Sequence, residues 1–99
     1  MAFFQVTSRE LRNKAETLRS LNGQFRAKCN DLSSQEQELC SMWEGQAKDA
    51  FHHAFARDQE QMTSFEKLIE RYVEVMLEIA ARYEEAENRN AEIASSRSY

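Results

Sequence analysis

Apolar residues recur at alternating steps of four and three along most of the chain, and this pattern constrains the fold more than any other feature. In the second half of the chain the alternation continues without interruption from Phe51 to Ala86, and Asp58 is the only polar residue at these positions. The 99 residues include no proline. Such a repeat places one apolar seam along a helix and is typical of helices that pack lengthwise against each other. The sequence therefore predicts an all-α protein built from long helices.

The first helix is predicted to span about residues 7–42. Thr7 supplies a hydroxyl cap and Glu10 follows three residues later, which is the spacing of a capping box. Gly23 lies in the middle of this helix and costs about 1 kcal/mol relative to alanine, so we expect a bend or local looseness there but no break. Apolar residues recur every seven positions. Those expected in a core or dimer contact are Leu18, Phe25, Leu32 and Leu39.

The segment SMWEGQAKDAF, residues 41–51, holds the only tryptophan and one of the two glycines. Gly45 tolerates the positive φ that a chain reversal needs, so we predict a turn at about 43–45. A second helix is expected over about 46–93, with a frayed tail beyond it. Packing explains Trp43 less well, because a ring at the tip of a hairpin is partly wet and exposed tryptophan is enriched at binding hot spots.

The second helix carries more apolar surface than one neighbouring helix can cover. Between Phe65 and Ala80 the apolar positions span an arc of roughly 200° at about 100° per residue. A large exposed apolar face marks an interaction surface. We therefore predict two helix-turn-helix hairpins that dimerise into an antiparallel four-helix bundle. The expected core or dimer positions of this helix are Phe51, Phe55, Met62, Phe65, Ile69, Tyr72, Val75, Met76 and Ile79.

Charge and hydropathy argue against several classes of partner. The 13 basic and 17 acidic residues are interspersed and give a formal net charge of −4, which is not the footprint of a nucleic-acid-binding protein. The first ten residues lack the pattern of a secretory signal peptide. No run approaches the roughly 18 apolar residues of a membrane span, so stable membrane insertion is not expected.

The residues that could carry catalysis or bind a metal are scattered along the sequence. Cys29 and Cys40 lie about 16 Å apart along one helix, beyond disulfide reach, and are interpreted as small thiols, with an intermolecular disulfide or a reactive thiol as the alternative. His52 and His53 are adjacent and point about 100° apart, so they cannot share a metal. Neither an enzyme nor a bound metal or cofactor is therefore expected.

The turn motif Trp43-Glu44-Gly45, followed by Ala47 and Phe51 in a helix-turn-helix chain of this length, closely resembles the WXG (ESAT-like) proteins of type VII secretion systems. The likeness covers essentially the whole chain. A second family feature is Y-x-x-x-D/E near the C-terminus. It is matched here by YEEAE, with Tyr83 and Glu87 on one helix face.

The resemblance implies a protein made in the cytoplasm and secreted without a cleaved signal peptide, as a folded dimer recognised by an FtsK-like membrane ATPase. Counting back from the turn places Thr7 opposite about residue 81. Tyr83 and Glu87 are thus expected just beyond the hairpin end that is opposite Trp43. In an antiparallel dimer, the turn of each protomer would meet this segment of its partner. The predicted secretion signal is therefore composite and consists of Trp43, Gly45, Tyr83 and Glu87.

Two alternatives stay open at this point. A paralogous WXG protein could replace the second copy in the dimer, and a cytosolic helical adaptor or coiled-coil scaffold would explain the heptads equally well. The scaffold gives no reason for Trp43 at the turn or for the spacing of Tyr83 and Glu87. The sequence also leaves open whether an exported dimer is an effector, a component of the apparatus or a chaperone.

Overall fold

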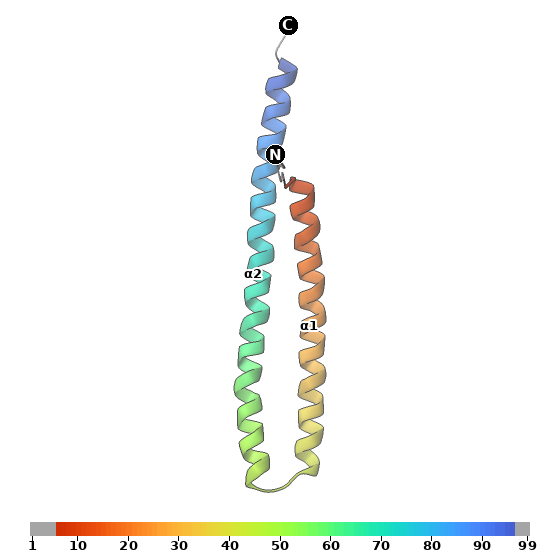
Figure 1. The fold of residues 1–99 in the computed structure, drawn as a ribbon, viewed down its shortest axis with the longest axis vertical. Helices are drawn as coiled ribbons and strands as arrows, with labels where there is room; N and C mark the ends of the chain where they lie inside the picture. Colours follow the sequence, from red (N-terminus) through yellow and green to blue (C-terminus); the bar gives the residue numbers. More distant parts are fainter. Residues whose placement is uncertain (1–5, 97–99) are drawn as a thin grey trace, which may run out of the picture.

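The computed structural model describes residues 6–96, which form two long antiparallel helices. α1 spans Ser8–Met42 and α2 spans Gln46–Ser96, and the two lie side by side from the connecting turn to the start of α1 (Figure 1). The molecule is a rod of 84 × 26 × 16 Å. The prediction of an all-α helix-turn-helix hairpin is confirmed.

α1 begins at the capping box that the sequence predicts. The Thr7 hydroxyl accepts a hydrogen bond from the Glu10 backbone N–H at 3.1 Å, and the Glu10 carboxylate accepts one from the Thr7 N–H at 3.4 Å. These bonds satisfy donors that the first helical turn leaves without an intrahelical partner. The helix then runs through Gly23 without a break, as expected.

α2 ends later than the sequence predicts. Its expected end was Ile93, but the helix continues to Ser96 and extends well past the start of α1 (Figure 1). The segment Ala91–Ile93 contains good helix formers, and no glycine or proline follows to stop the helix. The rest of the predicted frayed tail, 97–99, lies outside the described residues. Both helices are long, but neither contains a stretch that is apolar enough to cross a bilayer.

The buried apolar side chains of the hairpin are few, and two of the three are alanines. Ala15 and Ala80 are 0% exposed and Val73 is 3% exposed, and these residues form the buried apolar core of the hairpin. Large seam side chains flank this contact, for example where Phe25 and Phe65 meet edge to face at 5.5 Å. The expected core positions that are half-buried are Leu18, Phe25, Phe55, Met62, Ile69, Met76 and Ile79. Those that stay exposed are Leu32, Leu39, Phe51, Phe65, Tyr72 and Val75.

Polar contacts also join the helices. Arg12 binds the Glu84 carboxylate through two nitrogens at 2.5 and 3.0 Å, and Arg26 binds Glu66 at 2.5 Å. The hydrogen bond from Arg12 lowers the pKa of Glu84 below its ordinary value. The buried Asn22 amide donates to the Glu66 carbonyl oxygen at 3.0 Å. A buried polar contact of this kind favours one alignment of two helices over its alternatives.

Candidate functional site

The turn between α1 and α2 depends on the backbone of Gly45. Trp43 ends α1 in an extended conformation, and Gly45 follows with φ +112°, as the sequence predicts. A Cβ built on Gly45 would meet nothing within 4 Å, so the backbone conformation, not crowding, requires glycine. The Asp49 N–H then donates to the Gly45 carbonyl oxygen at 3.4 Å. Asp49 is also the acidic residue in the first turn of α2.

The Trp43 ring packs on the beginning of α2 and is only half-buried. Its centroid lies 5.7 Å from that of Phe51, and Phe51 in turn stacks on Phe55 at 6.4 Å. These contacts hold the indole in place by its apolar surface. Part of the ring remains accessible at the tip of the hairpin, where a partner could contact it.

Tyr83 and Glu87 lie on α2 beside the first turn of α1. Tyr83 is 45% exposed, whereas the Glu87 carboxylate accepts hydrogen bonds from the Ser8 N–H at 3.4 Å and the Ser8 hydroxyl at 3.0 Å. Glu87 is exposed and lies at the end of the hairpin opposite the turn, but its carboxylate is bound by the first residue of α1, a contact that the sequence did not predict. Helical side chains lean toward the N-terminus of their own helix, so this carboxylate reaches back along α2 to α1. Its negative charge also suits the positive end of the α1 dipole.

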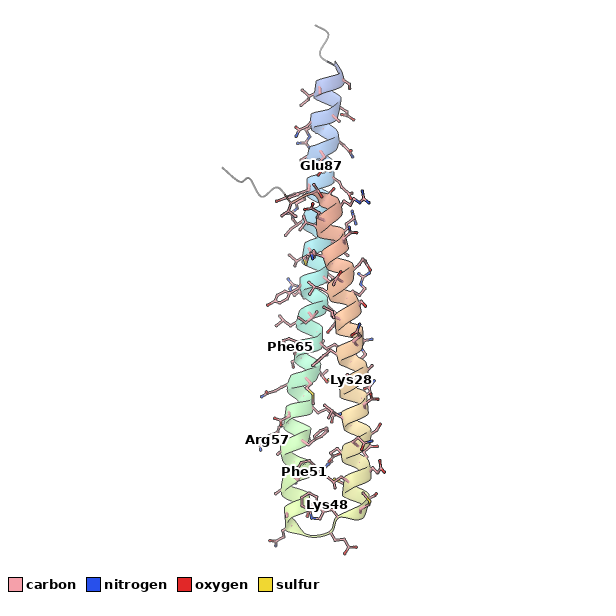
Figure 2. The ribbon with its side chains drawn as sticks, turned by 45° about the vertical axis from the view of Figure 1, so that its right-hand side comes forward. Lys28, Lys48, Phe51, Arg57, Phe65 and Glu87 are labelled. Atoms are coloured by element: carbon pink, nitrogen blue, oxygen red, sulfur yellow. The ribbon has the colours of Figure 1, made fainter. Side chains whose placement is uncertain are left out.

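The two halves of the predicted signal occupy opposite ends of one hairpin. Figure 2 shows Glu87 beside the start of α1 and Lys48 at the far end, next to the turn that holds Trp43 and Gly45. A single chain thus separates them by most of the length of α1. The sequence predicts this separation, and only a second molecule could bring the halves together.

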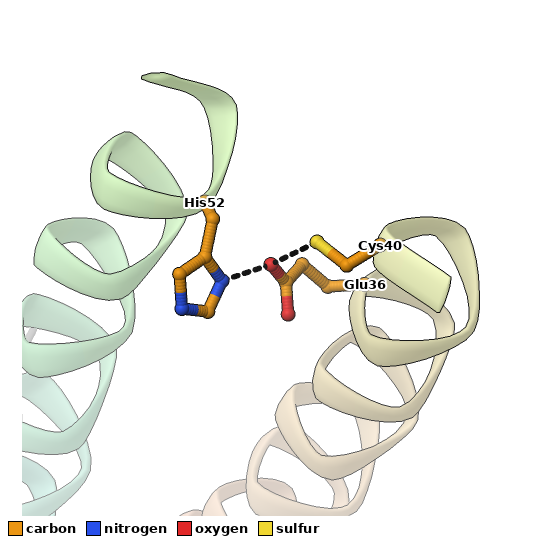
Figure 3. Close-up of side chains that lie close together, drawn as sticks. All are labelled: Glu36, Cys40 and His52. Atoms are coloured by element: carbon orange, nitrogen blue, oxygen red, sulfur yellow. Dashed lines mark hydrogen bonds and ion pairs between the residues drawn. The ribbon is translucent and has the colours of Figure 1, made fainter. Parts of the chain in front are cut away.

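Besides the two parts of the predicted signal, the structure brings together three side chains close to the turn that the sequence did not predict to meet. The Glu36 carboxylate Oε1 lies 2.5 Å from His52 Nδ1 and 3.1 Å from Cys40 Sγ, so α1 and α2 meet there through polar atoms (Figure 3). Both contacts lower the pKa of Glu36, and the carboxylate raises the pKa of the Cys40 thiol because it accepts the thiol hydrogen bond. Glu36 and His52 are equally spaced on either side of Glu44, and that symmetry about the turn could have revealed the pairing.

The chain belongs to the WXG100 family, proteins of 100 residues with WXG, whose model matches residues 4–88. The matched range includes the turn motif Trp43-Glu44-Gly45, and it also includes Tyr83 and Glu87 of the YEEAE segment. A comparison with curated proteins gives no significant match.

Solved structures show the same fold. The selenomethionine-labelled secreted protein EsxB of Bacillus anthracis strain Sterne is 21% identical, with a TM-score of 0.78 over 88% of this chain and 99% of that one. Wild-type EsxB from the same strain, in the P21 space group, is 21% identical with a TM-score of 0.76, over 85% of this chain and 97% of that one. At this identity the likeness establishes the helical hairpin.

Proposed function

We propose that this chain is exported by a type VII (ESX-like) secretion system as a folded dimer, and that it acts by binding and not by catalysis. The observation that carries the proposal is the turn, where a half-buried Trp43 and a positive-φ Gly45 stand at the tip of a WXG100-family hairpin. The similar EsxB structures are of a secreted protein, which supports export.

An uncovered apolar strip supports the dimer. Along α2, exposed side chains follow one another at helical steps of three and four: Phe65, Leu68, Tyr72 and Val75. Toward the turn, further exposed apolar side chains continue on both helices: Leu32, Leu39, Met42 and Phe51. A surface of this extent is costly to leave in water. A second copy of the chain, packed antiparallel, would cover this strip along its whole length. A paralogous WXG protein is the alternative partner.

Antiparallel pairing also completes the proposed signal. The turn of one protomer would lie beside Tyr83 and Glu87 of the other, so each dimer would carry two composite surfaces. Tyr83 is exposed for such contact, and Ser8 holds the carboxylate of Glu87 in a fixed position. An FtsK-like ATPase that reads this surface would select folded dimers over unfolded chains.

The test is the ratio of protein in the culture medium to protein in the cells of its source organism. We expect the wild-type chain in the medium, and we expect it to remain in the cells when the secretion ATPase is deleted. Trp43→Ala should remain in the cells while keeping its helix content. Trp43→Phe, which retains a ring against Phe51, separates loss of packing from loss of the indole.

Two results would contradict the proposal. Wild-type protein that stays in cells with an intact secretion system would favour the cytosolic scaffold. Export of folded Trp43→Ala at the wild-type ratio would give the W-x-G turn a purely structural role.

A further inference from the structure

We propose that Glu36, Cys40 and His52 form a binding site for Zn²⁺ at the turn end of the hairpin. The inference is independent of export, because it rests on three side chains that the secretion signal does not use. Glu36 and Cys40 come from α1, one helical turn apart, and His52 comes from α2 (Figure 3).

The positions of the donor atoms fit a small ion. One ligand atom from each residue lies within 4.8 Å of the others, and His52 Nδ1 and Cys40 Sγ both converge on the same oxygen of Glu36. Ligand atoms around a tetrahedral zinc are about 3.2–3.8 Å apart, as follows from metal-ligand distances of roughly 2.0–2.3 Å. The separation of the donor atoms thus exceeds the spacing around zinc by at most about an ångström, so small adjustments of the three side chains would bring them around an ion.

The donor set selects the type of metal. A thiolate, an imidazole and a carboxylate together suit zinc, whereas magnesium and calcium prefer oxygen ligands alone. The Glu36 side chain is 5% exposed, so its charge is held away from bulk water, where a cation can neutralise it. His52 is 55% exposed at the side chain, which leaves room for water in the fourth tetrahedral position.

Binding would replace the contacts that Glu36 Oε1 makes with Cys40 Sγ and His52 Nδ1. The Cys40 thiol now donates to Glu36, and coordination requires that thiol to lose its proton to solvent. The ion would then join α1 to α2 close to the turn. A bound ion would stabilise the folded hairpin, because the site is assembled from two helices and does not exist in the unfolded chain.

The chain supplies its own controls for a test. Cys29 lies on α1 but contacts Met62 instead of the cluster, at 3.5 Å between the sulfur atoms. His53 is the exposed neighbour of His52. Substitutions at Cys29 and His53 thus change the same residue types outside the proposed site.

The experiment titrates Co²⁺, and then Zn²⁺, into the untagged, reduced full chain while absorbance and the thermal melt are recorded. We expect a sulfur-to-cobalt charge-transfer band that Zn²⁺ abolishes, and a rise in melting temperature with Zn²⁺. Cys40→Ser should lose the band, and His52→Gln should weaken binding at least about tenfold. Cys29→Ser and His53→Gln should bind as the wild type does.

Circular dichroism of each variant shows whether the hairpin is folded. A folded wild-type protein without the band, or a band that survives in Cys40→Ser, would overturn the proposal. In that case the three side chains form a hydrogen-bonded link between the helices and nothing more.

Discussion

At the scale of single residues, Glu87 combines a contact within the hairpin with a proposed role in recognition, and an experiment must separate the two. Its carboxylate accepts two hydrogen bonds from Ser8 at the start of α1, and it is also the acid of the proposed C-terminal signal. A carboxylate at this position satisfies backbone donors and favours the helix dipole. Loss of Glu87 would thus affect stability whether or not the residue also takes part in recognition.

Matched substitutions at Glu87 and Ser8 resolve the two roles. Glu87→Ala should lower the free energy of unfolding by about 1 kcal/mol, because Ser8 loses its acceptor, and should also prevent export. Ser8→Ala removes one of the same hydrogen bonds but leaves the carboxylate in place, so it should cost less stability and leave export intact. Thermal melts and the ratio of medium to cellular protein measure both effects. Equal loss of export in the two variants would show that Glu87 acts only through the fold.

At the scale of the helices, the two glycines have opposite roles although both have open space around them. Gly23 lies inside α1 with helical backbone, whereas Gly45 has φ +112° in the turn. An alanine at position 23 meets no neighbour within 4 Å and gains helix propensity. An alanine at position 45 meets no neighbour either, but must adopt a conformation that its Cβ disfavours.

The two alanine variants should therefore shift stability in opposite directions. Gly23→Ala should raise the free energy of unfolding by about 1 kcal/mol. Gly45→Ala should lower it by roughly 1–3 kcal/mol, because the strained φ is retained or the turn rearranges. Denaturant unfolding followed by circular dichroism gives both values. A Gly45→Ala protein as stable as the wild type would show that the turn does not need a positive φ.

The sequence predicted local features well and contacts between the helices poorly. The capping box at Thr7 and the reversal at Gly45 depend on residues close in sequence, so the element starts were readable. The Ser8–Glu87 and Glu36–His52 contacts depend on the register of α1 against α2. Simple counting from the turn placed Thr7 opposite about residue 81, and it ignored how far a long side chain reaches toward its helix N-terminus. Ala15, Val73 and Ala80 were not among the expected core positions, because the pattern shows which face is apolar but not which side chains become buried.

At the scale of the whole molecule, the buried core of the hairpin over residues 6–96 is too small to cover its large side chains. Among the described residues, the buried apolar core consists of Ala15, Val73 and Ala80. The aromatic and aliphatic side chains on the flank of α2 remain in contact with water. We infer that the folded unit in solution is the dimer, and that the hairpin is half of a four-helix bundle.

Light scattering coupled to size-exclusion chromatography tests this inference most directly. At micromolar concentration we expect twice the chain mass of 11.6 kDa. Val75→Lys should dissociate the dimer and lower the melting temperature, because it would place an unpaired charge in the interface at a cost of several kcal/mol. Thr63→Lys adds the same charge at an exposed position on another side of α2 and should remain dimeric. A well-folded wild-type protein with the mass of one chain would contradict the account.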